Sequence, residues 1–437
     1  MRTISLLQKK RLTTAANIFK AANRKDEKVL SNTMKKKLSQ PACLALKLAS
    51  TFISKKVAPR LFFIFIFLQI QCYSFAQDSS HIRISLLTCT PGQELYSTFG
   101  HTAIRITDSI SLTDYVFNYG TFNFEDDGFY TKFIRGKLLY YLSAENFSDF
   151  KFAYQAENRG ITEQLLNLDA EEKIALKQAL YENAKEKNRY YKYDFFFDNC
   201  TSRARDMLVK YKKDHPSFQP VMPKGTSFRQ AIHLYLDKNE KDWSKLGIDL
   251  LLGAPTDAIM STVHSQFLPD NLMKSLDSSN QSTPLVISTK NLYPITEQKE
   301  KSLLFTPLFI FSFLFTCILL MSFSSTHWVK IFLNGFDGVF FFLIGTLGVL
   351  LIFMWWGTDH SMTKNNYNLL WAWPTHIITA FLMPSQKKWV KKYFGLQAAA
   401  LLIILIGWFF LPQQLNTSLI PLVLVMIFRS AKKYVKS

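Results

Sequence analysis

Two short stretches carry residues whose types suit nucleophilic catalysis. Cys200 lies in "YDFFFDNCTSRARD" (193–206), where an aromatic run gives way to a helix-like pattern, and His101 lies in the strand-like stretch "YSTFGHTAIRI" (96–106). A thiol at a helix N-terminus has a lowered pKa, because the helix dipole and the free N–H groups favour the thiolate. An imidazole beside it would take the thiol proton. We therefore predict that Cys200 is a nucleophile and that His101 is its general base.

The residues that flank Cys200 favour this chemistry. A helix that begins near Asn199, with Asp198 or Asn199 as its cap, places Cys200 in the first helical turn. Arg203 and Arg205 would then add positive potential near the thiol.

Further polar residues are candidates for completing the site. Asn118, on the next predicted strand, is expected to orient the imidazole of His101. Backbone N–H groups around Cys200 would hold an oxyanion, and Tyr96 is a candidate for a further donor. The alternative for Tyr96 is a structural position in the core.

The cysteine count leaves a structural alternative for Cys200. The chain has five cysteines, and Cys89, Cys200 and Cys317 lie beyond the predicted leader. Cys317 falls in a predicted membrane segment. In an oxidising compartment, a disulfide between Cys89 and Cys200 would make Cys200 structural.

The elements that would position these residues belong to an α+β domain. Alternating or β-rich runs predict strands, and one amphipathic run predicts a helix in which Asp169 is the cap and Glu172 follows three residues later. The predicted strands lie in 81–92, 94–108, 113–124 and 193–197, and the predicted helix spans 168–191.

The N-terminal segment reads as a secretory signal that follows a basic leader. Residues 1–60 contribute +13 of the formal net charge of +19, and the apolar run in 61–80 ends in small residues that suit cleavage near Ala76. The alternative to a cleaved signal is an uncleaved signal anchor, and Met34 is a candidate for the start of the chain. Because the remaining positive charge lies beside apolar segments, we expect no nucleic-acid partner.

Beyond residue 302 the chain has the composition of a membrane domain with five apolar stretches, 303–323, 336–356, 369–384, 394–411 and 417–429. The basic segments 386–393 and 429–437 predict a cytoplasmic C-terminus and an outward-facing soluble domain. The predicted organisation is a basic leader and signal (1–76), a periplasmic catalytic domain (77–275), a linker (276–302) and a transmembrane domain (303–437).

Several stretches resemble a known family. "PGQELYSTFGHTAIRI", "YVFNYGTFNF", "YDFFFDNCTSRARD" and "LLGAPTDAIMSTVHSQFLPDNLM" resemble an exported domain family of Gram-negative bacteria whose fold is similar to a circularly permuted papain-like (NlpC/P60-type) domain. "TDHSMTKNNYNLLWAWPTH" resembles the membrane domain that accompanies it in the lipoprotein N-acyltransferases called Lnb. Within this resemblance Cys200 and His101 match the catalytic pair, whereas Asn118 matches by position only.

The resemblance implies an inner-membrane enzyme without a cofactor. Its acyl donor would be a phospholipid and its acceptor a diacylated lipoprotein. Asp359, His360 and Asn365 lie in a tryptophan-rich loop at the outer interface, where we expect them to contact a headgroup or the lipoprotein amine. The alternative for these three is a polar loop within an aromatic belt.

Two rival functions fit the same residues. One is a membrane-anchored cysteine peptidase or amidase that acts on cell-wall peptides, and the other is a non-catalytic lipid- or lipoprotein-binding protein. The sequence contains none of the HExxH, CxxC, Walker-type or GxSxG motifs, and its eight histidines lack metal-ligand spacing, so we predict no metal.

Overall fold

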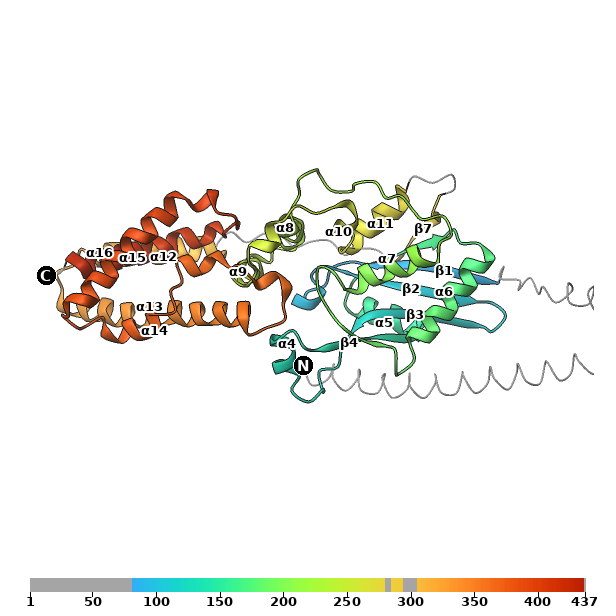
Figure 1. Ribbon diagram of the computed structural model, residues 1–437, viewed down its shortest axis with the longest axis horizontal. Helices are drawn as coiled ribbons and strands as arrows, with labels where there is room; N and C mark the ends of the chain where they lie inside the picture. The colour runs from blue at the N-terminus through green and yellow to red at the C-terminus, as the bar shows by residue number, and fades with distance from the viewer. Residues whose placement is uncertain (1–80, 280–283, 294–304, 436–437) are drawn as a thin grey trace, which may run out of the picture. The chain divides into compact units, whose positions relative to one another are not determined.

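The computed structural model describes residues 81–279, 284–293 and 305–435, which Figure 1 draws as ribbon. The predicted leader and signal (1–76) and its cleavage site lie outside the described residues.

Seven antiparallel strands form one sheet in the order β6-β4-β3-β2-β1-β5-β7. They are β1 (Ile82–Cys89), β2 (His101–Asp108), β3 (Thr113–Thr121), β4 (Leu139–Asn146), β5 (Ile161–Leu166), β6 (Tyr190–Lys192) and β7 (Val286–Tyr293).

The strand predicted at 193–197 is wrong. The strand β6 ends at Lys192, and Asp194 then accepts hydrogen bonds from the backbone N–H groups of Phe196 and Phe197. An aspartate that binds the N–H groups two and three residues ahead closes a turn, so the aromatic run after β6 cannot extend along a sheet.

Helices cover both faces of this sheet. The soluble part contains η1 (Leu95–Ser97), α4 (Phe129–Ile134), α5 (Phe147–Ala156), α6 (Ala170–Asn183), α7 (Cys200–Tyr211), α8 (Phe228–Lys238), α9 (Asp242–Leu251), η2 (Ala254–Asp257), α10 (Thr262–Ser265) and α11 (Pro269–Asp277). Asp169 and Glu172 form the predicted capping box at the start of α6.

The period of two along β2 separates the two faces. Ile104 packs in a cluster with Leu208 of α7, whereas the adjacent Ala103 packs with Phe150 of α5. Because successive side chains of a strand point to opposite faces, His101 lies on the α5 face and Thr102 on the α7 face. The sheet is therefore buried on both sides, and the predicted α+β class is confirmed.

The segment predicted as a linker, 276–302, contains an ordered strand. Residues 286–293 form β7, which pairs with β5 at the edge of the sheet. Its sequence "VISTKNLY" is half polar, and most of its side chains are at least partly exposed, as is typical of an edge strand that faces water. The polar composition that suggested a linker therefore reflects an exposed sheet edge.

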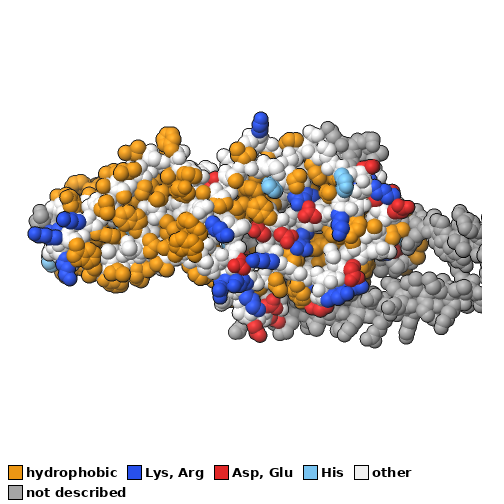
Figure 2. All heavy atoms as spheres, viewed as in Figure 1, with side chains coloured by type: hydrophobic (Ala, Val, Ile, Leu, Met, Phe, Trp, Pro, Cys, Tyr) orange, Lys and Arg blue, Asp and Glu red, His pale blue; other side chains and the backbone are white. Residues whose placement is uncertain are grey.

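The C-terminal part is helical. It contains α12 (Pro307–Met321), α13 (His327–Trp356), η3 (Ser361–Thr363), η4 (Tyr367–Leu370), α14 (His376–Thr379), η5 (Ala380–Leu382), α15 (Lys388–Ile406), η6 (Trp408–Phe410), η7 (Thr417–Leu419) and α16 (Ile420–Val435). By length and composition α13 and α15 are sufficient to cross a membrane, and α12 is a shorter apolar helix. Figure 2 shows hydrophobic side chains over much of the surface of these helices.

The third predicted span, 369–384, is not one continuous helix. It is divided into short helical turns, with Pro374 between η4 and α14. Proline lacks the N–H that would continue a helix. The segment also packs closely on α13, because a Cβ at Gly348 would lie 2.2 Å from the carbonyl oxygen of Ala372.

Hydrogen bonds connect the α9–η2 region with the loops of the helical domain. The N–H of Gly253 donates to the carbonyl of Met362, and the N–H of Ala254 donates to the carbonyl of Asn365. Gly253 has no Cβ, and one built there would lie 1.8 Å from the carbonyl oxygen of Lys364. The glycine of "LLGAPTD" therefore permits two backbones to approach each other directly.

A buried ion-pair network supports the same contact. Arg229, which is fully buried, binds Asp249 at 2.8 Å and Asp257 at 2.9 Å. Asp249 also accepts a hydrogen bond from Asn416 of the helical domain at 2.8 Å. Since every charge in the group has a partner of opposite sign, α8, α9 and the helical domain are held together without an unpaired buried charge.

Candidate active site

Cys200 is the first residue of α7, and the start of this helix is firmly fixed. Asn199 is the cap; its Oδ1 accepts hydrogen bonds from the N–H groups of Thr201 at 2.9 Å and Ser202 at 2.8 Å. Its Nδ2 donates to the carbonyl of Phe267 at 2.8 Å. Of the two predicted caps, Asn199 is correct, and the cap satisfies helix N–H groups that would otherwise lack partners.

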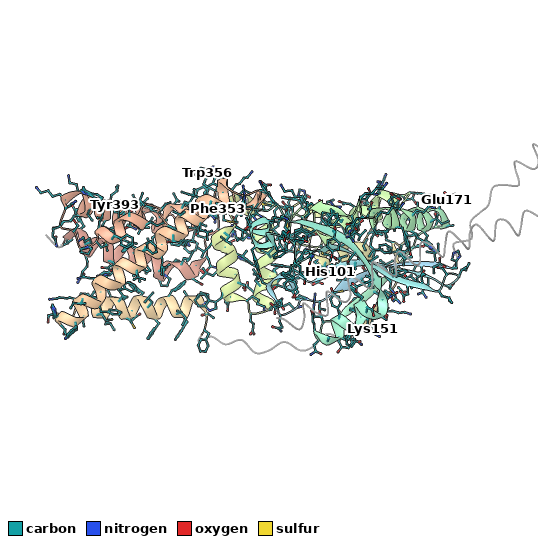
Figure 3. The ribbon with its side chains drawn as sticks, turned by 90° about the horizontal axis from the view of Figure 1, so that it is seen from below. His101, Lys151, Glu171, Phe353, Trp356 and Tyr393 are labelled. Carbon is teal, nitrogen blue, oxygen red and sulfur yellow. The ribbon has the colours of Figure 1, made fainter. Side chains whose placement is uncertain are left out.

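His101 begins β2 and contacts Asn118 of β3. The His101 Nε2 lies 3.1 Å from Asn118 Oδ1, and the Asn118 Nδ2 donates to Glu145 at 2.8 Å. Since the amide nitrogen of Asn118 donates to Glu145, the amide oxygen of Asn118 faces the ring. This oxygen can only accept, so the ring must carry a proton on Nε2. The Nδ1 is then the ring nitrogen available to a thiol. Figure 3 labels His101 among the strands of the sheet.

Two contacts bring α7 to the ends of β2 and β3. The hydroxyl groups of Thr102 and Thr201 lie 3.1 Å apart, and both residues are buried. The pairing of β3 with β4 shifts between Asn118 and Thr121, which leaves Gly120 in a left-handed conformation with φ of 86°. A Cβ on Gly120 would lie 3.5 Å from the Cβ of Cys200, so the bulge of β3 adjoins the thiol.

The environment of Cys200 favours the thiolate. Burial by itself would raise the pKa of the thiol, but the charge of His101, a hydrogen bond with its ring, the N–H of Thr102 and the hydroxyl of Thr201 together lower the pKa from 9.0 to about 7. A thiol with this pKa is substantially ionised at neutral pH.

The pKa of the His101 imidazole shifts in the opposite direction, upward. Burial would lower the pKa of His101, but the charge of Cys200 and hydrogen bonds with Cys200 and Asn118 raise it above 6.5. Each group therefore favours the charged form of the other, which is the arrangement of a thiolate–imidazolium pair.

Cys89 lies opposite His101 in the register of β1 and β2, but its chemistry differs. It is fully buried, and burial raises the pKa of its thiol to about 12. Cys89 and Cys200 are both free in the structure, so the alternative of a disulfide between them is not observed. Of the two thiols beside His101, only Cys200 is poised to ionise near neutral pH.

The two arginines after Cys200 are not placed as predicted. Arg203 forms a two-bond ion pair with Asp198 at 2.6 and 2.7 Å, and Arg205 binds Asp206 at 2.7 Å. Neither arginine is among the main causes of the lowered pKa of Cys200. A guanidinium that is paired with a neighbouring carboxylate gives little net field, and the positive charge that acts on the thiol is that of His101.

Fewer backbone N–H groups around Cys200 are available to an oxyanion than we predicted. The N–H groups of Thr201 and Ser202 are used by Asn199, so they cannot also bind an oxyanion. Among the described residues, no acceptor binds the N–H of Cys200 itself. This N–H lies 4.0 Å from the Cβ position of Gly120 and is the backbone donor best placed to stabilise an oxyanion at the thiol.

The other predicted site residues do not join the thiol. Tyr96 is 64% exposed, and its ring packs edge-on against Phe122 at 6.3 Å. Asp359 pairs with Lys192 at 2.9 Å, and His360 Nε2 donates to the carbonyl of Ile134 at 3.0 Å.

Asn365 is also placed in the contact between the domains. Its side chain is exposed, whereas its carbonyl binds Ala254. The substrate contacts predicted for Tyr96, Asp359, His360 and Asn365 stay predictions.

Sequence reasoning missed three residues of the site. Glu145 binds Asn118, Gly120 adjoins the thiol, and Tyr193 lies next to Cys200 in the same apolar cluster. The motif "FNYG" contained a signal for Gly120, since a glycine inside a strand pattern often indicates a bulge. No such signal indicated Glu145, because the pairing of β3 with β4 cannot be deduced from the spacing of residues in the sequence.

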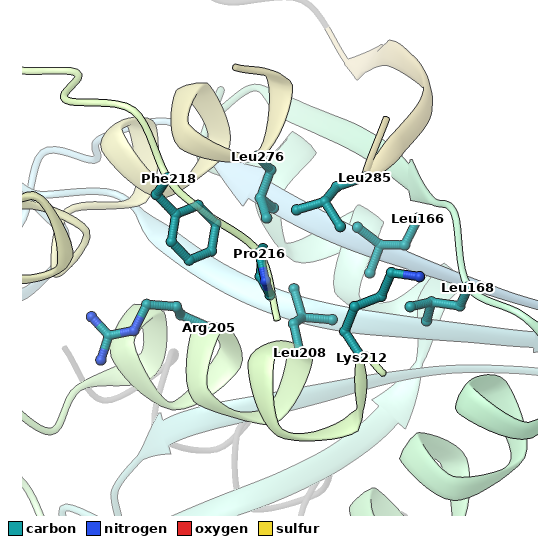
Figure 4. A pocket seen from close by; sticks show the side chains of 9 residues that line it. All are labelled: Leu166, Leu168, Arg205, Leu208, Lys212, Pro216, Phe218, Leu276 and Leu285. Carbon is teal, nitrogen blue, oxygen red and sulfur yellow. The ribbon is translucent and has the colours of Figure 1, made fainter. Parts of the chain in front are cut away.

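Among the described residues, neither a cluster of metal ligands nor the apolar pocket of Figure 4 lies at the thiol site. Within 81–279, 284–293 and 305–435, no group of three or more His, Cys, Asp or Glu side chains is arranged to hold a metal ion. The apolar pocket of Figure 4 lies along later turns of α7, and its lining includes Leu208, Lys212 and Phe218 but no residue of the thiol site.

Two family models match the chain. The Lnb N-terminal periplasmic domain matches residues 73–224, which contain the thiol, the imidazole and Asn118, and the Lnb transmembrane domain matches residues 298–437. No curated protein and no solved structure matches significantly. The matches agree with the resemblance found in the sequence, whereas the permuted papain-like fold stays a prediction.

Proposed function

The chain belongs to the Lnb family in both its periplasmic and its transmembrane domain, and from this premise we propose that it is a thiol-dependent lipoprotein N-acyltransferase. Membership makes it a lipoprotein-modifying membrane protein, and a periplasmic domain joined to a transmembrane domain fits the inner membrane. The observation that supports the chemistry is the interaction of Cys200 with His101, which lowers the pKa of the thiol to about 7.

The first half-reaction would form an acyl-enzyme. The Cys200 thiolate attacks the ester carbonyl of a phospholipid, and the carbonyl oxygen becomes an oxyanion near the N–H of Cys200. As the C–O ester bond breaks, the imidazolium of His101 donates its proton to the leaving glycerol oxygen. The products are a lysophospholipid and a thioester between the acyl group and Cys200.

The second half-reaction would transfer the acyl group to the lipoprotein. The α-amine of a diacylglyceryl-cysteine attacks the thioester, the C–N amide bond forms and the C–S bond breaks. The neutral His101 takes the proton that the amine loses, which regenerates the thiolate–imidazolium pair. Asn118 would keep the imidazole in one orientation through both steps.

The orientation in the membrane would place the thiol outside the cytoplasm. The loops at Asn366 and Gln413 bind the carbonyls of Leu250 and Leu252, and they adjoin the soluble domain. Trp356 and Tyr393 lie toward opposite ends of the helices in Figure 3. The lysines around Tyr393, together with those at the end of α16, would face the cytoplasm, as the positive-inside rule requires.

The test is detection of the acyl-enzyme. The purified full-length protein is incubated with a phospholipid that carries a labelled acyl chain, first without acceptor and then with a diacylated lipopeptide. We expect a hydroxylamine-sensitive label on the Cys200 peptide that moves to the α-amine of the acceptor. Cys200→Ser should form no thioester, and Cys89→Ala should behave like the wild type.

Other outcomes distinguish the rival functions. Cleavage of peptidoglycan peptides without lipopeptide acylation would indicate a peptidase or amidase. Undiminished acylation by Cys200→Ala would show that the thiol is not the nucleophile.

A further inference from the structure

An exposed apolar face lies on the short helix α4. Tyr130 is 73% exposed, Phe133 49% and Ile134 46%. Positions i, i+3 and i+4 of a helix share one face, so these side chains form a continuous stripe. Phe129 of the same helix is buried and anchors α4 to the domain. A contiguous group of exposed large apolar side chains on a stable domain indicates a contact surface.

Hydrogen bonds fix this stripe close to the membrane. The helix α13 ends at Trp356, and the loop that follows binds the end of α4. The N–H of Asp359 donates to the carbonyl of Arg135 at 2.9 Å, and the ring of His360 donates to the carbonyl of Ile134 at 3.0 Å. Since only a few residues separate these partners from a helix that is long enough to span, the proposed orientation would place α4 at the level of the outer interface.

The charges beside the stripe suit phosphate headgroups. Lys132, Arg135 and Lys137 are exposed at the end of α4, and Asp359 faces Arg135, Lys137 and Lys192. Three cations therefore surround one carboxylate, which leaves net positive charge at the interface. Figure 2 shows Lys and Arg side chains over this part of the surface, with Asp and Glu side chains among them. Three acidic residues lie on the preceding loop, 125–127, at the opposite end of the helix.

A series of aromatic contacts leads from this helix toward the thiol. The rings of Phe129 and Phe122 lie 5.9 Å apart, and those of Phe122 and Tyr140 5.3 Å apart. Tyr140 stacks on Tyr193 at 4.3 Å. Tyr193 and Cys200 are both partly buried members of one apolar cluster, and both lie within 4 Å of a Cβ built on Gly120.

We propose that the α4 stripe docks on the outer leaflet and that the aromatic series guides the acyl chain of the donor phospholipid from the bilayer to Cys200. The inference rests on the proposed acyltransferase function, for which it supplies the route of the donor. The cations at the end of α4 would hold the headgroup phosphate at the interface. Tyr96, which packs against Phe122, would form part of the wall of this route rather than an oxyanion donor.

Photocrosslinking in membranes tests the location without requiring activity. The full-length protein is reconstituted in vesicles of phosphatidylethanolamine and phosphatidylglycerol that contain a phospholipid with a diazirine near the carbonyl end of one acyl chain. After illumination, mass spectrometry should find adducts on the peptide that contains Tyr130 and Phe133. Crosslinks confined to residues 305–435 would overturn the proposal. Cys200→Ala should give the wild-type crosslinks, because docking precedes chemistry.

Kinetics provide the second measurement. In the double variant Tyr130→Ser/Phe133→Ser, loss of two interfacial aromatic contacts should raise KM for the phospholipid about tenfold and leave kcat largely unchanged. The matched control is Ile110→Ser/Leu112→Ser, which removes two side chains that are 73% and 88% exposed in the turn after β2. An unchanged KM in the α4 variant, or an equal rise in the control, would refute the route.

The two proposals fail in different ways. If the wild type forms no thioester although lipid crosslinks to α4 are present, the acyltransferase function is wrong. If the thioester forms while no crosslink reaches α4, the function stands and the route is wrong.

Discussion

The Asn118 side chain lies between His101 and Glu145, with its oxygen 3.1 Å from the imidazole Nε2 and its nitrogen 2.8 Å from the glutamate. The glutamate thereby determines which end of the amide faces the ring. Because an amide oxygen can only accept, the ring must donate from Nε2. Nδ1 is then the ring nitrogen left to exchange a proton with the thiol. We expect Asn118 and Glu145 to position the imidazole of His101, so replacing either should change the chemistry of that ring.

Replacement of Asn118 should leave the imidazole of His101 without the contact that fixes its orientation. In Asn118→Ala the ring loses its partner, and we expect kcat to fall about 10- to 100-fold with little change in KM for either substrate. Asn118→Gln should recover part of the activity, since it retains the amide oxygen. A purely structural role would instead lower the melting temperature in parallel with activity, so thermal unfolding is measured on the same samples.

The pH dependence of alkylation should report the thiolate of Cys200. Since its pKa is about 7, iodoacetamide should label the Cys200 peptide slowly below pH 7 and at a nearly constant rate above it. In His101→Ala the lowering by the imidazole is lost while the effect of burial remains, so the pKa should rise to 9.0 or higher. At pH 7 the thiolate fraction then falls about 50-fold. A profile unaffected by His101→Ala would contradict the interaction.

Cys89 provides an internal comparison for that experiment. Its thiol is fully buried with a pKa raised to about 12, so it should resist iodoacetamide throughout the range from pH 6 to pH 9 in which Cys200 reacts. Labelling is mapped by peptide mass spectrometry, and Cys89 should become reactive only after denaturation. Equal labelling of both cysteines in the native protein would show that the site is more open than the structure indicates.

The candidate site could be predicted from sequence because local patterns specify it. The "DNC" sequence combines a cap with a thiol in the first helical turn, and the alternation around His101 indicates a strand. What could not be predicted depends on pairing between distant strands. The partner Glu145 of Asn118 is set by the register of β3 with β4, and the ion pairs that neutralise Arg203 and Arg205 depend on side-chain geometry.

In the fold, too, local sequence patterns predict some elements and not others. The helix α6 and its cap follow from local spacing, whereas β7 looked like a linker because an exposed edge strand is as polar as a loop. The third apolar stretch of the membrane domain looked like a span because hydropathy does not register Pro374 or the close packing on Gly348. Composition thus indicated the membrane domain but not how its chain is divided into helices.

The buried network around Arg229 should control stability rather than chemistry. In Arg229→Met, Asp249 and Asp257 lose the guanidinium, and Asp249 keeps only His233 as a basic partner, at 2.8 Å. We expect a loss of about 3 to 5 kcal/mol in the free energy of unfolding. Lys245→Met is the control, because the side chains of its ion pair with Asp237 are 23% and 48% exposed, and we expect the pair to be worth less than about 1 kcal/mol. Thermal unfolding of the full-length protein compares the two, and similar losses would mean that the network is not stabilising.

Gly120 allows a direct test of the space beside the thiol. Gly120→Ala combines two effects, a backbone penalty of about 1 kcal/mol for an L-residue at φ of 86°, and a new methyl group 3.5 Å from the Cβ of Cys200 and 4.0 Å from its N–H. If this N–H binds the oxyanion, the methyl group should lower the rate of acyl-enzyme formation about 10- to 100-fold. Gly225→Ala is the matched control, because Gly225 also has a positive φ, of 87°, but a Cβ there meets nothing within 4 Å. The two variants should be destabilised to a similar degree in thermal unfolding, whereas only Gly120→Ala should lose acylation rate. Equal acylation rates in both would place the oxyanion elsewhere.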